Sequence, residues 1–281
     1  MYLLDRLASC GTNRPPTITD GDCNVRLPND IPEPGANPVA QPPTLTALCD
    51  VPNSSWTLQT SHFASTIFMA STLGRIQRSL LQHHGASDPY PPWHARSEYM
   101  LIDSLLLSFE VYSDAIDSDM TTGLDRRYPG EGVVSEQRAG NFVFSIVLYH
   151  MNQCLLRHPF LLWKSLQTCG TRPPSSFLND SRRRALEHAK VLSDVLRVIY
   201  ERGMSITSFY GYACTVACTI FRLYMEHEDI QTASFAKHQY VISLEFLRRG
   251  GSIWAHYARM VSLACFPVCP PLRAVLTSSA T

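Results

Sequence analysis

The sequence carries no excess of charge of either sign: 24 Lys and Arg balance 24 Asp and Glu, which leaves a formal net charge of zero. A protein dedicated to nucleic-acid binding usually has a basic excess, so this balance argues against a long phosphate-contacting surface. No run of eighteen uninterrupted apolar residues occurs, which argues against a conventional transmembrane helix. The amphipathic start, with an early acidic residue at Asp5, is unlike a signal peptide.

Familiar catalytic motifs are lacking as well. G-x-S-x-G, Walker-type loops, G-x-G-x-x-G and H-E-x-x-H do not occur. The nine scattered cysteines contain no C-x-x-C, which excludes a zinc cluster built on two such pairs. Their odd number and apolar surroundings are typical of a reducing intracellular compartment. We therefore expect no enzyme, no cofactor and no metal, although residue types alone leave a Cys/His hydrolase open.

What is present is a core-forming, helical pattern. Hydrophobic residues make up 45% of 281 residues, enough for one large or two small domains. Alternation with a period of two appears nowhere at length, so we predict an all-α protein, an irregular multi-helix bundle of six to eight helices. We expect a helix end plus an extended arm at 1–27, a long Pro-rich loop at 28–55, a helical domain at 56–266 and a tail at 267–281.

The prolines of the 28–55 segment are expected to rule out regular helix there. They are Pro28, Pro32, Pro34, Pro38, Pro42, Pro43 and Pro52. Apolar spacing predicts helices over about 56–85, 94–116, 135–157, 181–202, 208–226, 232–249 and 254–266. Asp117–Gly132 is predicted to be a loop, Asn179–Ser181 to cap the following helix, and Gly203 to end it.

The first residues predict a specific contact. Met1–Ala8 has the spacing of a helix end, and Pro15 and Pro16 then favour an extended path. Asp5 and Arg6 are neighbours and point in different directions, and a buried charge needs a partner. We expect one of the two to hold the extended segment, with Asp20 or Asp22 as the acceptor for Arg6. The alternative is a solvated helix end whose charges matter little.

The same segment contains the spaced pattern Y-x-L-D-R-x-x-S from Tyr2, R-P at Arg14, I-x-x-x-D from Ile18 and V-x-L-P ending at Pro28. This set resembles the fungal-specific regulatory domain of zinc-cluster transcription factors. Two later segments resemble the family in the expected order: Leu-Leu-Arg157-His158-Pro159-Phe-Leu and Phe-Tyr-Gly-Tyr-Ala from Phe209. The chain departs from the family pattern by two extra residues before Arg14 and by the lack of the usual aromatic and Arg-rich helix before Tyr2.

The resemblance implies a nuclear, pathway-specific transcription regulator, with a biosynthetic gene cluster among its possible targets. It implies a homo- or heterodimer, contacts with the transcription machinery, and DNA binding only through an upstream zinc cluster that this sequence lacks. We expect a truncated regulatory domain. The motif residues would be architectural: Asp5, Arg6, Arg14, Pro15, Asp20, Pro28, Arg157, His158 and Pro159. The alternative is a free-standing helical effector-binding or protein-interaction module, with a pocket between the helices that include 142–156 and 209–224.

Several side-chain groups could carry chemistry, but each has a simpler interpretation. Cys214 and Cys218 share a helical face and could bind zinc together with Cys265 and Cys269, although apolar packing is favoured. His150 and His158 also share a helical side, and we interpret both as satisfied or solvated histidines. Two further groups have open alternatives. The acidic run 226–229 could be a solvated helix end or a metal site. The basic run 182–184 lies near a predicted helix start and could contact phosphate or act in nuclear import.

Overall fold

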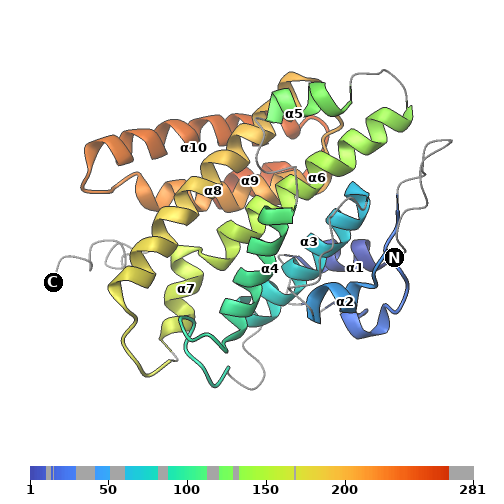
Figure 1. The fold of residues 1–281 in the computed structure, drawn as a ribbon. Helices are drawn as coiled ribbons and strands as arrows, with labels where there is room; N and C mark the ends of the chain where they lie inside the picture. Colours follow the sequence, from blue (N-terminus) through green and yellow to red (C-terminus); the bar gives the residue numbers. More distant parts are fainter. Residues whose placement is uncertain are drawn as a thin grey trace. The chain divides into compact units, whose positions relative to one another are not determined.

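The structure is a computed structural model, and it describes residues 1–10, 14, 16–29, 42–50, 61–81, 88–112, 120–128, 133–167 and 169–265. Within these ranges it has eleven α-helices and no strand, apart from an isolated bridge between Arg26 and Thr44 (Figure 1). The all-α prediction is confirmed, with more helices than the six to eight expected. None of the helices in the described ranges has the length and apolar character needed to cross a bilayer.

The chain divides into two compact units, which we describe separately. Unit 1 comprises 1–82 with 101–148, and unit 2 comprises 83–100 with 149–281. Two of the three boundaries fall within helices, α4 (Glu98–Tyr112) and α6 (Val133–Leu156). The expected division at residues 27, 55 and 266 stays a prediction, since much of 28–55 and all of the tail 267–281 lie outside the described residues.

Unit 1 is organised around α3. This helix spans His62–Ile76. Besides parts of α4 and α6, the other elements of the unit are α1 (Tyr2–Ser9), the 3-10 turn η1 (Asp20–Asp22), α2 (Leu45–Asp50), the π-helical turn η2 (Gln77–Leu81) and α5 (Met120–Arg127). The hydroxyl of Ser61 caps α3 by accepting the Ala64 N–H group at 3.2 Å. Most of α3 is buried, and the hydroxyls of Thr66 and Thr72 donate to carbonyls one turn earlier, which satisfies them in the core.

Two helices of unit 1 lie where the sequence predicted none. The six residues of α2 form a helix inside the 28–55 segment. Proline disfavours helix at its own position and at the residue before it, and α2 lies between Pro43 and Pro52, where neither restriction applies. Leu45 and Leu48 of α2 are both 2% exposed, so burial supports a helix too short to be stable alone. Likewise α5 occupies the predicted loop 117–132, and its Leu124 is buried.

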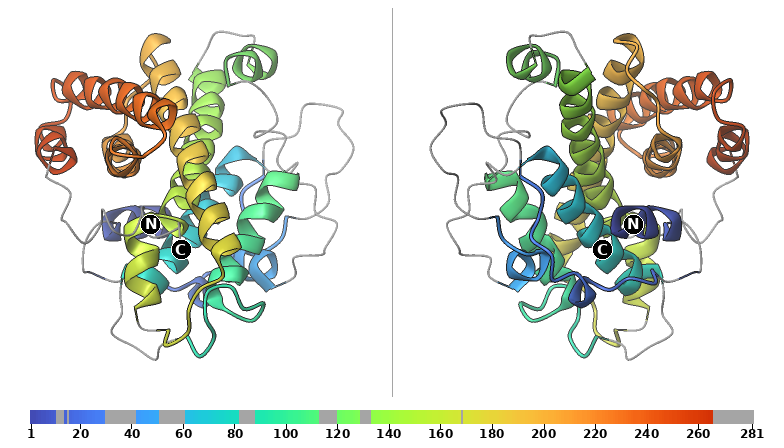
Figure 2. Two further views of the ribbon diagram at one scale, coloured as in Figure 1. Left: turned by 90° about the vertical axis from the view of Figure 1, so that its left-hand side faces the viewer. Right: turned by 90° about the vertical axis from the view of Figure 1, so that its right-hand side faces the viewer.

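Unit 2 contains the remaining helices: α7 (Pro159–Leu166), α8 (Ser175–Glu201), α9 (Ser208–Tyr224), α10 (Ile230–Gly250) and α11 (His256–Ala264). Figure 2 shows α9, α10 and α11 next to one another in both side views, and each pair is in contact. The start of α8 was predicted too late: its cap is Pro174, not Asn179–Ser181. Its end is confirmed, because Gly203 follows with a left-handed φ of 64°.

A buried tyrosine joins α11 to its two neighbours. Tyr257 is fully buried, and its hydroxyl donates to the Thr207 carbonyl at 2.8 Å. The ring lies directly over Gly211 of α9 and Gly250 of α10, so that a Cβ at either glycine would overlap it. Gly250 thus leaves room for the Tyr257 ring. It does not supply a left-handed turn, because the two glycines with positive φ in the described residues do not include Gly250.

We predict that Gly250→Ala lowers the free energy of unfolding by about 1–3 kcal/mol, because the added methyl group forces Tyr257 out of place. Urea denaturation followed by circular dichroism measures the change. Gly140→Ala in α6 is the matched control, since a Cβ there meets nothing within 4 Å. That control should raise stability by about 0.5–1 kcal/mol through helix propensity. Equal effects at the two glycines would contradict the packing described.

Candidate functional site

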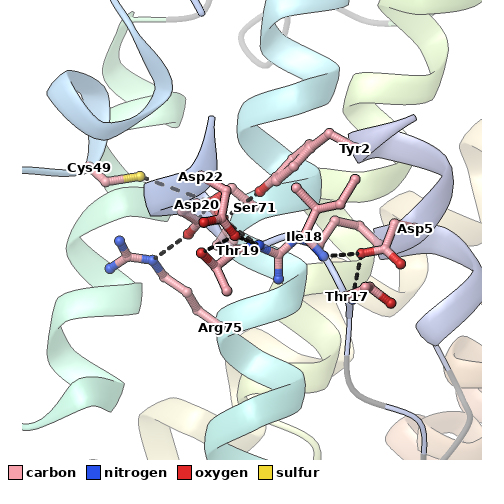
Figure 3. A network of polar contacts seen from close by, with 12 residues as sticks. Tyr2, Asp5, Thr17, Ile18, Thr19, Asp20, Asp22, Cys49, Ser71 and Arg75 are labelled. Carbon is pink, nitrogen blue, oxygen red and sulfur yellow. Dashed lines mark hydrogen bonds and ion pairs between the residues drawn. The ribbon is translucent and has the colours of Figure 1, made fainter. Parts of the chain in front are cut away.

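Asp5 holds the extended arm to α1 (Figure 3). Its Oδ2 atom accepts the backbone N–H groups of Thr17 at 2.8 Å and Ile18 at 2.9 Å. The Ile18 N–H bond, with further help from Thr17, holds the pKa of Asp5 below its ordinary value. One carboxylate therefore satisfies two amides of a segment that has no regular structure of its own.

Asp20 is the centre of a second, more buried cluster (Figure 3). Its Oδ1 atom accepts the Arg6 Nη2 group at 2.6 Å and the Tyr2 hydroxyl at 2.5 Å. Its Oδ2 atom accepts the Ser71 hydroxyl at 2.9 Å and lies 3.5 Å from Nε of Arg75. This one carboxylate therefore connects α1, η1 and α3 within unit 1.

Arg6 is the most deeply enclosed charge of this cluster, at 1% exposure. Its guanidinium lies over the Tyr2 ring at 4.9 Å. It also occupies the space that a side chain at Gly74 would need, with Arg6 Cδ 3.1 Å from the position of a Cβ there. Burial, followed by the hydrogen bond to Asp20, raises the pKa of Tyr2, so the phenol stays a neutral donor.

The sequence did not identify three partners of this cluster: Ser71, Gly74 and Arg75. They follow one another at helical spacing on α3, so a shared face was readable. Ser71 and Arg75 contact Asp20 and Gly74 faces Arg6, however, and these are tertiary contacts between residues far apart in the sequence. Asp22, the other expected acceptor for Arg6, instead accepts the N–H and hydroxyl groups of Thr19 in a capping box.

Three other residues of the expected motif belong to this segment: Arg14, Pro15 and Pro28. Arg14 is exposed, and Pro15 lies outside the described residues. Pro28 is half-buried, and its carbonyl accepts the Ser61 hydroxyl at 3.1 Å, which links the end of the arm to the cap of α3. The structure thus brings Asp5, Arg6 and Asp20 together.

The Arg157-His158-Pro159 segment forms the turn between α6 and α7. Arg157 is 2% exposed and donates to Gln153 Oε1. Nδ1 of His158 accepts the Phe160 N–H group at 3.3 Å and so caps α7. Pro159 occupies the first position of α7, where its missing N–H group costs nothing. Pro159 therefore marks the start of a second helix after the end of α6.

The second ring nitrogen of His158 defines its tautomer. Nε2 lies 3.0 Å from the Thr219 hydroxyl, which itself donates to the Val216 carbonyl at 2.7 Å. We infer that Nε2–H donates to Thr219 while Nδ1 stays unprotonated for the cap. Burial lowers the pKa of His158 to about 4, which agrees with a neutral ring.

A histidine pair lies nearby in unit 2. Nδ1 of His150 in α6 and Nδ1 of His188 in α8 are 3.0 Å apart, so one nitrogen carries the proton and the other accepts it. Burial lowers the pKa of His150 to about 3. Burial, followed by the charges of His150, Arg157 and Arg184, lowers the pKa of His188 to about 2. His188 was missed from the sequence because the two residues are 38 positions apart.

The candidate metal groups do not converge. No group of three or more His, Cys, Asp and Glu side chains that could hold a metal exists in the described ranges. Cys214 and Cys218 are fully buried, and burial raises the pKa of the Cys214 thiol, which donates to the Ser243 carbonyl at 3.2 Å. Cys265 is exposed, and Cys269 lies outside the described residues.

The two charged runs contact residues close to them in the sequence. Within 226–229, Asp229 caps α10 by accepting the Thr232 N–H group at 2.8 Å. Within 182–184, Arg183 pairs with Asp180 at 2.6 Å and Glu187 at 2.9 Å. Because α8 begins at Ser175, this basic run lies past its first turn, contrary to the prediction.

A mainly apolar cavity of about 470 Å³ lies between α8, α9 and α10 in unit 2. Cys214, from the predicted helix 209–224, lines this cavity, but no residue of 142–156 does. It is therefore not the pocket between those two segments that the sequence predicted.

We predict that Asp20→Asn lowers the free energy of unfolding by about 2–3 kcal/mol, because it leaves the buried Arg6 charge without its counter-ion. Asp22→Asn, in the same turn but exposed, should cost clearly less, because it weakens only an exposed cap. Chemical denaturation compares the two. In an Arg6→Met background the Asp20→Asn effect should shrink, and full additivity would contradict the pairing.

The His150–His188 pair predicts acid sensitivity. Both rings take up a proton near pH 6.5 when unfolded but only near pH 3 or below when folded. The free energy of unfolding should therefore fall as pH drops from 6.5 towards 3, because the unfolded chain then binds more protons than the folded chain. His188→Gln removes one such group and should flatten this slope in urea titrations at stepwise pH. An unchanged slope would show that the pair does not control acid stability.

No known family description matches the chain, and no solved structure matches it. The chain is similar to a curated protein, the Zn(2)-C6 fungal-type transcription factor FTF1c of Fusarium oxysporum f. sp. lycopersici, at 22% identity over 279 residues. The match covers 92% of this chain but 28% of that protein, so the chain spans less than a third of its relative. This similarity supports a distant relationship to a fungal transcription factor.

Proposed function

We propose that this chain is the helical regulatory part of a transcription regulator of the zinc-cluster kind, acting in the nucleus on a defined set of genes. The observation that carries the proposal is the similarity to a fungal transcription factor along 92% of the chain. The polar network adds support, because Tyr2, Asp5, Arg6 and Asp20 from the resembling segment form contacts in one place.

The proposed mode of action is contact rather than catalysis. The carboxylates of Asp5 and Asp20 already accept hydrogen bonds from the chain itself, which suits a scaffold better than a reaction centre. The chain lacks the paired C-x-x-C of a zinc cluster, so we propose that specific DNA binding depends on such a cluster outside this sequence. This chain would contribute contacts with a second regulator subunit or with the transcription machinery.

A second candidate function is a helical effector-binding or interaction module without a role at DNA. The cavity between α8, α9 and α10 favours this alternative, because its volume lies within the range of about 300–1,000 Å³ typical of small-molecule sites. The two candidates differ in whether the chain changes transcription when it is placed at a promoter.

Tethering tests the proposal directly. We predict that the chain, fused to an unrelated DNA-binding domain in a fungal host, changes the output of a reporter beyond that of the domain alone. The purified chain without the fusion should show no sequence-specific retardation of DNA, since its charge is balanced and the cluster is lacking.

The Asp20→Asn fusion is the matched variant, because it keeps the surface and weakens the buried Arg6 contact. It should lose part of the reporter effect together with stability. A folded, nuclear fusion that leaves the reporter unchanged would favour the module without a role at DNA.

A further inference from the structure

The cavity in unit 2 has apolar walls from two helices. Leu196 of α8 and Phe246 of α10 are buried within it, whereas Val241 of α10 is 57% exposed at its edge. Ile242 is half-buried beside Val241. An apolar molecule entering here would be removed from water on several sides, which is the main source of affinity in such sites.

Three polar side chains of the lining, Ser193, Cys214 and Ser243, already have hydrogen-bond partners. The Cys214 thiol donates to the Ser243 carbonyl at 3.2 Å, and the Ser243 hydroxyl donates to the Gln239 carbonyl at 2.9 Å. The Ser193 and Ser243 oxygens are 3.0 Å apart, so Ser193 donates to Ser243. No hydrogen of these three lining side chains remains for a ligand, but the Ser193 oxygen can still accept one.

The charges at the cavity also cancel. Arg197 lies 3.3 Å from Glu201, and Arg249 lies 2.6 Å from Glu245, so the two cations of the lining are paired with its two anions. The Arg249 guanidinium in addition lies over the Tyr200 ring at 5.0 Å. An anionic ligand would have to break one of these pairs or approach a carboxylate, which disfavours it.

We propose that this cavity binds a neutral, mainly apolar small molecule that carries at most one hydrogen-bond donor, directed at Ser193. Leu196, Ile242 and Phe246 form the binding wall. The inference goes beyond the proposed function and fails separately from it, because a negative binding result leaves the outcome of promoter tethering untouched.

N-phenylnaphthylamine is a suitable probe, because it is neutral, aromatic and has a single N–H group. Titrated into the full chain, it should bind saturably at one site with a rise in fluorescence. Anilinonaphthalene sulfonate has the same skeleton plus a negative charge, and it should bind at least about tenfold more weakly. Non-saturable binding of the neutral probe, or equal affinity of the two probes, would overturn the proposal.

Variants locate the site. Ile242→Trp fills the cavity from α10 and should weaken the neutral probe about tenfold or more. Val241→Trp should act in the same direction, and its exposed starting position keeps the fold intact. His238→Trp, exposed on the same helix but outside the lining, is the control and should bind as the original chain does. Unchanged affinity in the folded Val241→Trp and Ile242→Trp proteins would overturn the proposal, because the probe would then bind elsewhere.

Discussion

A buried guanidinium needs a counter-charge, and this requirement organises unit 1. Arg6 can remain at 1% exposure because Asp20 receives its Nη2 group at 2.6 Å. Asp20 reaches that position only if the arm after α1 turns back, and Asp5 fixes this turn by accepting two arm amides. The helix α3 has to leave room for the cation, and Gly74 provides it. Asp5, Arg6, Asp20 and Gly74 thereby connect α1, the arm and α3.

Unit 2 is held by a different means, the close approach of helices. Tyr257 can lie between α9 and α10 because Gly211 and Gly250 have no side chains beneath its ring. Buried polar groups there pair internally, as with His150 and His188 or Ser193 and Ser243. Histidines kept neutral by burial make this packing conditional on pH. The cavity lies where α8, α9 and α10 separate enough to leave space between apolar walls.

These arrangements bear on function because the carboxylates of Asp5 and Asp20 already accept hydrogen bonds from the chain. The side chains of Asp20, His158 and Cys214 likewise bond to other groups of the chain. This chemistry supports the proposed role through contact rather than catalysis. A regulatory role fits this chemistry, and the distant similarity to a fungal transcription factor points in the same direction.

The sequence by itself determined the fold class, the long helices α8 to α10 and the expectation that Asp5 or Arg6 contacts the arm, because periodicity and the cost of burying charge act locally. The tertiary structure alone decided the rest. Short helices such as α2 and α5 form because Leu45 and Leu124 are buried, which no local propensity specifies. The choice of Asp20 over Asp22, the pairing of His150 with His188 and the place of the cavity depend on contacts between distant segments. Those contacts arise only once the helices have packed, so sequence spacing carries no signal for them.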